Sequence, residues 1–126
     1  MLNTICVMGR LTREPELRMT QSEVPVCSFT VAVDRDAKKG ETDFIDCVAW
    51  RTTAEFVNRN FAKGQFIIVH GSLQSRKWVD RNDQSRISWS IQVTNVYFGG
   101  DKKAEKKQEE GGFKEMEDEG DGELPF

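Results

Sequence analysis

The segment TDFIDCVAWRTTAEFVNRNFAKG, residues 42–64, contains two adjoining patterns from which most of the architecture can be predicted. Residues 43–50 are rich in branched and aromatic side chains and follow a polar turn segment, which is typical of a strand. Directly afterwards, Ala54, Val57 and Phe61 recur at the i, i+3 and i+7 spacing of one helical face. The segment therefore predicts a strand that runs into one short helix.

Both ends of this helix carry recognisable signals. Thr52 and Glu55 fit a capping box, in which the threonine is the N-cap and the glutamate reaches back to it. Lys63-Gly64 is a good C-terminal stop, since glycine readily adopts the left-handed backbone that ends many helices.

Strand patterns occur on both sides of the helix. Alternating, branched-rich segments cover residues 3–11 and 26–34 before it, and residues 64–73 and 86–98 after it. The predicted order is three strands, a helix and two strands, which is the order of an OB-fold, a small barrel that often binds oligonucleotides. The predicted fold class is therefore all-β: a five-stranded OB-fold Greek-key barrel with one short helix between strands 3 and 4.

Charge is unevenly distributed along the chain. Residues 1–100 carry 13 Lys and Arg against 11 Asp and Glu, whereas residues 101–126 carry 5 against 10. A segment with high charge and few apolar residues is expected to be disordered. We therefore expect an OB-fold domain over residues 1–100, a disordered charged linker over 101–116 and an acidic protein-interaction tip over 117–126.

Cysteine and histidine usage argues against a zinc site or a disulfide framework. Cys6, Cys27 and Cys47 are widely spaced, no CxxC pair occurs, and His70 is the single histidine. We expect buried free thiols in a reducing compartment, with no metal and no other cofactor. The sequence has no apolar N-terminal segment and no apolar run of about 18 residues, so a cytoplasmic protein is expected.

One face of the strand over residues 43–50 is unusual for a core. Phe44, Asp46, Val48 and Trp50 share it, so that two large aromatic rings lie beside an aspartate. Either a neighbouring strand or subunit covers this face, or it is a platform for stacking bases. Exposed aromatics can hold single-stranded nucleic acid without reading its sequence, because every base has a π-face.

A cationic arm is predicted from SLQSRKWVDRNDQSR, residues 72–86. Its cations and its tryptophan, grouped around an Asn-Asp turn, are Arg76, Lys77, Trp78, Arg81 and Arg86. Such an arm is either a clamp for phosphates or a solvated hairpin, and the tryptophan favours the clamp. Trp89 shares a face with Ile87, Ile91 and Val93 and is interpreted as structural.

An enzyme is not expected. The serines have one histidine in the whole chain to activate them, the acidic residues are scattered, and no glycine-rich phosphate loop occurs.

Together these features resemble the bacterial and bacteriophage single-stranded DNA-binding proteins, the SSB family of OB-folds. The stretches that carry the resemblance are MLNTICVMGRLTREPELRMT, SFTVAVDRD, TDFIDCVAWRTTAEFV, KGQFIIVHGSLQSRKW and the terminal DGELPF. The resemblance implies sequence-independent binding and protection of single-stranded DNA in replication, recombination and repair. It places the protein in the bacterial nucleoid, or in the infected host cell if a phage encodes it.

The resemblance also implies which residues contact DNA. The positions of the base-stacking aromatics are occupied by Phe44, Trp50 and Trp78. The basic residues predicted to contact DNA are Arg18, Arg51, Arg76, Lys77 and Arg86.

An acidic tail that ends on apolar residues is a further family feature. The family uses a short acidic peptide ending in Pro-Phe to recruit replication and repair proteins, and the acids would steer the apolar anchor to basic pockets. The predicted partner-binding residues are Asp121, Glu123, Leu124, Pro125 and Phe126. The family further implies a homotetramer whose DNA wraps around several subunits.

The chain departs from the family pattern in three places. The loop DRDAKKGE, residues 34–41, has no stacking aromatic, Met19 stands where tyrosine is frequent, and the linker has only about twenty residues. One rival function keeps the same fold: a primosome-type protein–protein adaptor, in which the DNA face has become a docking face. Such adaptors usually lack the acidic Pro-Phe tail that this chain has.

Overall fold

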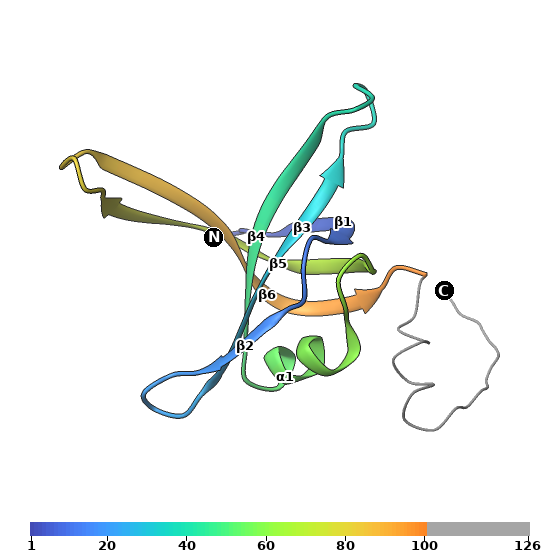
Figure 1. The fold of residues 1–126 in the computed structure, drawn as a ribbon, viewed down its shortest axis with the longest axis horizontal. Helices are drawn as coiled ribbons and strands as arrows, with labels where there is room; N and C mark the ends of the chain where they lie inside the picture. The colour runs from blue at the N-terminus through green and yellow to red at the C-terminus, as the bar shows by residue number, and fades with distance from the viewer. Residues whose placement is uncertain (101–126) are drawn as a thin grey trace.

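The computed structural model describes residues 1–100, in which six strands and one helix form a closed, mostly β structure (Figure 1). The strands are β1 (Ile5–Leu11), β2 (Glu16–Met19), β3 (Pro25–Asp34), β4 (Thr42–Trp50), β5 (Phe66–Val79) and β6 (Ser85–Phe98). Helix α1 (Arg51–Asn60) connects β4 to β5. The predicted linker and interaction tip lie outside the described residues.

The sheet closes because β1 pairs with a strand on each side. Neighbouring strands of the sheet are hydrogen-bonded in the order β1-β5-β6-β4-β3-β2, and β1 additionally pairs with β3. In the two ladders, Val7 lies opposite Val69 of β5 and Leu11 lies opposite Val31 of β3. A closed β structure with one short helix is consistent with the predicted OB-fold.

The structure has one strand more than the five that were predicted. The additional strand, β2, pairs antiparallel with β3, so that Arg18 lies opposite Val26. Pro15 lies between β1 and β2, and a proline cannot donate a hydrogen bond to a ladder. Residues 16–19 read ELRM, so polar and apolar side chains do alternate, but the segment is only four residues long and all four are exposed.

The core lies inside the closed sheet and against α1. The helical face predicted from Ala54, Val57 and Phe61 is confirmed, because all three side chains are fully buried. The Phe61 ring stacks on Phe98 of β6, with 4.8 Å between the ring centroids. The helix therefore covers one end of the core with residues that its sequence spacing had already placed on one face.

The beginning of α1 differs from the predicted one. The helix starts at Arg51, with Trp50 as N-cap and without a side-chain capping hydrogen bond, so the Thr52–Glu55 capping box is not formed. Strand β4 runs directly into the helix, and Arg51 turns the chain with a left-handed φ of 60°. Thr52 is consequently already inside the helix, where it cannot take the extended conformation of an N-cap residue.

The end of α1 also comes earlier than predicted. The helix stops at Asn60, and the Phe61 N–H donates the last bond to the Val57 carbonyl. Gly64 instead serves the turn that follows, with a φ of 85° and its N–H bonded to the Leu11 carbonyl at 2.8 Å.

Two of the three predicted buried thiols are buried. Burial raises the pKa of Cys27 to about 11 and that of Cys47 to about 12, so both are inert at neutral pH. Cys6 is exposed, contrary to the prediction, because β1 turns this side chain to the outside of the sheet between Ile5 and Val7. All three thiols are free.

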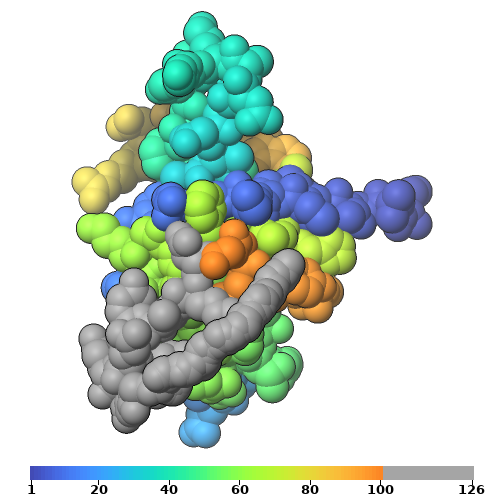
Figure 2. Space-filling view, turned by 90° about the vertical axis from the view of Figure 1, so that its right-hand side faces the viewer, coloured from blue at the N-terminus to red at the C-terminus, as the bar shows by residue number. Residues whose placement is uncertain are grey.

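The β5–β6, β3–β4 and β2–β3 hairpins project from the closed sheet (Figure 1). The outer halves of β5 and β6 form a two-stranded arm with the turn at residues 80–84, as predicted. The β3–β4 hairpin forms the second projection, which Figure 2 shows in cyan above the body, while the first residues of the chain reach out to the side in dark blue.

Two kinds of feature are absent from residues 1–100. None of the described helices is long and apolar enough to cross a membrane. Within the same residues, His, Cys, Asp and Glu side chains nowhere gather in groups of three or more that could hold a metal ion.

The packing of Phe61, directly after α1, on Phe98 of β6 generates a stability prediction. Phe61→Ala should lower the free energy of unfolding by about 3–5 kcal/mol, because it empties a fully buried aromatic site. Phe44→Ala is the matched control: this ring is 68% exposed, so the change should be within about 0.5 kcal/mol. Urea unfolding followed by circular dichroism at one protein concentration measures both. Equal losses for the two variants would contradict the described core.

Candidate nucleic-acid interface

The outer face of β4 presents the predicted aromatics to solvent. Alternation along the strand buries Cys47, whereas Phe44 is 68% and Trp50 is 44% exposed. Asp46, between them on the same face, accepts a hydrogen bond from the Thr30 hydroxyl of β3 at 3.0 Å. Within residues 1–100 no other element covers this face enough to bury the two rings, so it is not part of the core.

One row of paired residues connects Trp50 to Arg18. Arg18 of β2 lies opposite Val26 of β3, which in turn lies opposite Trp50 of β4. Paired residues point to the same face, and neighbouring strands are about 4.8 Å apart, so Arg18 and Trp50 start about 10 Å from each other. On the other side, the Trp50 indole N–H donates to Gln92 Oε1 of β6 at 3.1 Å. The face therefore extends from β2 to β6.

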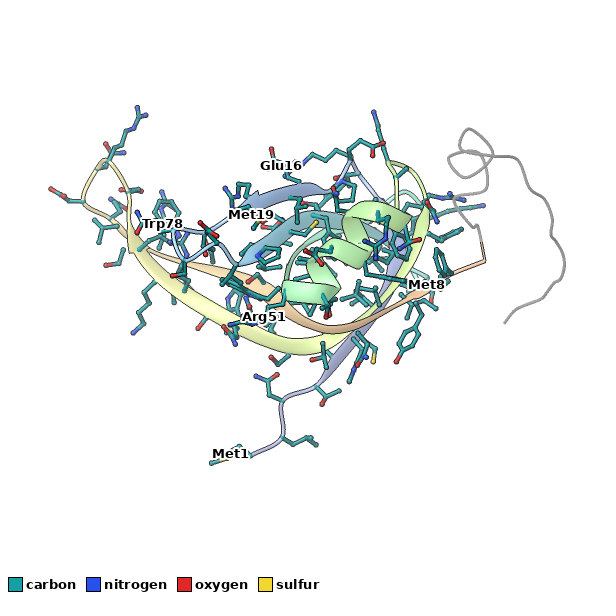
Figure 3. All side chains as sticks on the ribbon, turned by 90° about the horizontal axis from the view of Figure 1, so that it is seen from below. Met1, Met8, Glu16, Met19, Arg51 and Trp78 are labelled. Carbon is teal, nitrogen blue, oxygen red and sulfur yellow. The ribbon has the colours of Figure 1, made fainter. Side chains whose placement is uncertain are left out.

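The same face continues from Gln92 along the arm. Arg76 lies opposite Ser88, and Trp78 lies opposite Arg86, all on the face of Gln92 by strand alternation. The Trp78 indole N–H donates to Ser88 Oγ at 2.7 Å. Arg86 lies six positions before Gln92 along β6, which corresponds to about 20 Å of strand. Figure 3 labels Trp78 on this arm.

The turn at the tip of the arm is built on Asp80. Its Oδ1 accepts the backbone N–H groups of Asn82 and Gln84, at 2.9 and 3.0 Å. Its Oδ2 accepts the Nε–H of Arg86 at 2.8 Å. The hydrogen bond from Arg86, with help from the two backbone groups, lowers the pKa of the Asp80 carboxyl. Asp80 is therefore ionised at neutral pH and paired with a predicted DNA-contacting arginine.

Lys77 does not join the other predicted site residues. It lies opposite Ile87 on the reverse face of the arm, because neighbouring residues of a strand point to opposite faces. The structure thus brings Arg18, Trp50, Arg76, Trp78 and Arg86 onto one continuous face and separates Lys77 from them. Phe44 lies near the far end of β4, and Arg51 is exposed directly after Trp50.

The structural role predicted for Trp89 within this chain is wrong. Its side chain is 57% exposed, although Ile91 on the same face is fully buried. The arm carries Trp89 and Ile87 past the end of the closed sheet, where no side chain of the core reaches them. The reverse face of the arm is therefore an exposed apolar surface next to Lys77.

The β3–β4 hairpin contributes little free positive charge. Arg35 donates two hydrogen bonds to the Asp43 carboxylate, at 2.9 and 3.0 Å, and also pairs with Glu41 at 3.2 Å. The Arg35 hydrogen bond lowers the pKa of Asp43. Lys38 is paired with Glu41 as well. The hairpin that lacks a stacking aromatic thus has its arginine and one lysine already neutralised.

Sequence reasoning missed three residues that organise the interface: Gln92, Ser88 and Asp80. The first two tether the tryptophan rings, and a signal for them exists, because polar residues alternate at positions 86, 88, 90 and 92. Asp80 begins the polar turn DRND, where an aspartate often accepts hydrogen bonds from backbone two residues on.

Known proteins match this chain over the whole described fold. Residues 2–99 match the family described as "Single-strand binding protein family". The chain is 40% identical over 102 residues to the single-stranded DNA-binding protein of Caldanaerobacter subterraneus subsp. tengcongensis, covering 78% of this chain and 68% of that one. It is 39% identical over 102 residues to single-stranded DNA-binding protein A of Bacillus subtilis, covering 78% of this chain and 59% of the relative. It is 37% identical over 114 residues to single-stranded DNA-binding protein 1 of Staphylococcus aureus strain MSSA476, covering 87% of this chain and 73% of the relative.

The family match includes β4, α1 and the arm, which are the elements that build the exposed aromatic and basic face. An enzyme was not predicted from the sequence, and the family consists of binding proteins and not of enzymes. The chain belongs to the single-strand binding protein family.

Proposed function

We propose that the protein binds single-stranded DNA without sequence preference and protects it during replication, recombination and repair. The observation that carries the proposal is the continuous face on which Trp50 and Trp78 lie exposed among Arg18, Arg76 and Arg86. Aromatic rings spaced along a positively charged surface are the combination that holds single strands by base stacking and phosphate contacts.

The indole hydrogen bonds support a stacking role for the two tryptophans. Both N–H donors are engaged, one by Gln92 and the other by Ser88, so the rings are oriented before DNA arrives. A ring whose polar atom is already bonded offers its π-face to a base and no donor to a base edge. This explains why binding is expected to be insensitive to base sequence.

The finer roles rest on the family. Recruitment of replication, recombination and repair enzymes is proposed for the acidic tip with Asp121, Glu123, Leu124, Pro125 and Phe126, which lies outside the described residues. The Leu-Pro-Phe segment is chemically suited to an apolar pocket on another protein, and the preceding acids would steer it toward basic surroundings.

A homotetramer is proposed as well, and the outer face of β1, β5 and β6 supports it. Met8 lies opposite Ile68, which lies opposite Tyr97, and Met8 and Tyr97 are 51% and 53% exposed. Figure 3 shows Met8 at the opposite end of the molecule from Trp78. A second copy could therefore cover this row without blocking the proposed DNA face.

The first test is DNA binding by Trp78→Ala. Single-stranded DNA should quench the fluorescence of the wild type, because Trp50 and Trp78 stack on bases, and the variant should bind about 1–3 kcal/mol more weakly. Titration with oligo-dT measures both effects. Trp89→Phe is the matched control, since it alters a tryptophan on the reverse face of the arm, and it should bind like the wild type. Wild-type affinity for Trp78→Ala, or stronger binding to duplex in competition, would refute the proposed site.

Removal of residues 117–126 tests the proposed tip. The truncated protein should keep its melting temperature, because the composition of these residues cannot form a core. Its DNA affinity should stay equal or rise slightly, because an acidic tail can compete with phosphate for the basic face. Capture of replication and repair proteins from a bacterial lysate should be lost. Phe126→Ala and a one-residue extension after Phe126 separate the contribution of the ring from that of the terminal carboxylate. Equal capture of the same proteins by all these variants would refute the proposed tip.

A charge in the apolar row tests the tetramer. Met8→Glu should dissociate it, because a desolvated carboxylate without a partner is costly in an interface. Light scattering coupled to size exclusion should show a smaller mass. Met19→Glu is the matched control: Met19 is 60% exposed on β2, outside the row, and the variant should keep the wild-type mass. A Met8→Glu protein of unchanged mass would contradict a contact through this face.

A further inference from the structure

We propose that Asp80 is a positioning residue for single-stranded DNA: it holds the Arg86 guanidinium with its two terminal nitrogens presented to a backbone phosphate beside Trp78. The inference rests on the proposed DNA binding and assigns a role to a residue that does not itself contact DNA. Its basis is the way in which one carboxylate connects the turn to the arginine.

The two oxygens of Asp80 have separate partners. Oδ1 closes the turn by accepting the N–H groups of Asn82 and Gln84, and Oδ2 accepts Nε–H of Arg86. The turn also has its own backbone bonds, since Asp80 N–H donates to the Gln84 carbonyl at 3.0 Å and Asp83 N–H donates to the Asp80 carbonyl at 3.1 Å. The carboxylate is thus fixed by rigid backbone, and through Oδ2 it fixes the arginine.

The geometry leaves the reactive edge of the arginine exposed. The Asp80 side chain is 16% exposed, whereas that of Arg86 is 55% exposed. The less exposed carboxylate therefore binds the guanidinium at Nε, and the arginine side chain remains accessible to a ligand. Within residues 1–100, Arg86 makes its side-chain hydrogen bond through Nε, and its two terminal nitrogens have no partner. These two nitrogens form the fork that binds phosphate with two parallel hydrogen bonds.

Trp78 is held in the same way and directly opposite. It pairs with Arg86 across the arm, and its indole N–H is bonded to Ser88 Oγ at 2.7 Å. A base stacked on the ring would therefore have its phosphate near a guanidinium that is already oriented. The Arg86 side chain thus loses its conformational entropy during folding, so this loss does not reduce the affinity for DNA.

The charge of Asp80 alone predicts the opposite effect on DNA affinity, which makes the inference testable. Asp80 is an anion on a face that would bind phosphates, so as a mere charge it should weaken binding. Asp83, in the same turn, is exposed, and its side chain has no hydrogen bond within residues 1–100. Its φ of 61° is a conformation that asparagine tolerates well. Asp83→Asn therefore removes the same charge without removing a contact.

The experiment compares Asp80→Asn with Asp83→Asn in fluorescence titrations with oligo-dT at one salt concentration. Asparagine keeps the oxygen that closes the turn but replaces the acceptor of Arg86 by an NH₂ group. Asp80→Asn should bind about three- to ten-fold more weakly, the loss expected when one ordered side chain becomes mobile. Asp83→Asn should bind as well as the wild type or more tightly. Equal gains in affinity for both variants would refute the positioning role.

A double-mutant cycle separates Arg86 from the turn. In an Arg86→Ala background, Asp80→Asn should change the affinity by less than about two-fold, because the residue through which it acts is gone. A loss as large as in the wild-type background would show that Asp80 acts through the turn alone, and would overturn the inference. Wild-type protein that fails to bind oligo-dT would instead refute the proposed function, so the two failures are distinguishable.

Discussion

Strand β1 can close the sheet only because glycines stand where backbones nearly touch. A Cβ atom at Gly9 would lie 2.2 Å from the carbonyl oxygen of Ala32, and one at Gly71 would lie 2.1 Å from that of Gln92. Such distances cannot be relieved by a side-chain movement, because the obstacle in each case is backbone. The Gly9 approach lets β1 pair with β3 while it stays bonded to β5, which encloses the core, and the Gly71 approach lies where the β5–β6 ladder is irregular. The outer faces of β4 and β6 then become one continuous surface.

The cations of this surface are not equivalent. Arg18, Arg51 and Arg76 have no ion pair within residues 1–100, whereas Arg35 and Lys38 of the β3–β4 hairpin are neutralised by neighbouring carboxylates. Arginines without an ion pair within residues 1–100 thus lie on β2, at the start of α1 and on the arm. This distribution favours a path for DNA across the β4 platform and along the arm, in preference to the tip of the β3–β4 hairpin. The exposed Met8–Tyr97 row lies elsewhere, which leaves room for contacts between copies.

Local patterns in the sequence determined much of this protein by themselves. The helical face of Ala54, Val57 and Phe61, and the face that Phe44 shares with Trp50, follow from the periods of helix and strand, which involve only near neighbours. The position of the helix between two groups of strands predicted the fold class. The aromatic and basic residues of the proposed site were predicted from the resemblance to the family, and the structure leaves Trp50 and Trp78 exposed.

Only the tertiary structure decided where the closed sheet ends and the arm begins. That boundary depends on long-range pairs such as Cys47 with Ile91, and alternation alone cannot locate it. Trp89 and Ile91 share one face, yet one is exposed and the other buried because the boundary falls between them. The exposure of Cys6 has the same kind of origin, since alternation does not state which face of β1 meets the core. Asp80 and Arg86 are six positions apart, and they form an ion pair because the turn between them brings the Asp80 carboxylate next to β6. No periodic pattern in the sequence encodes such a contact.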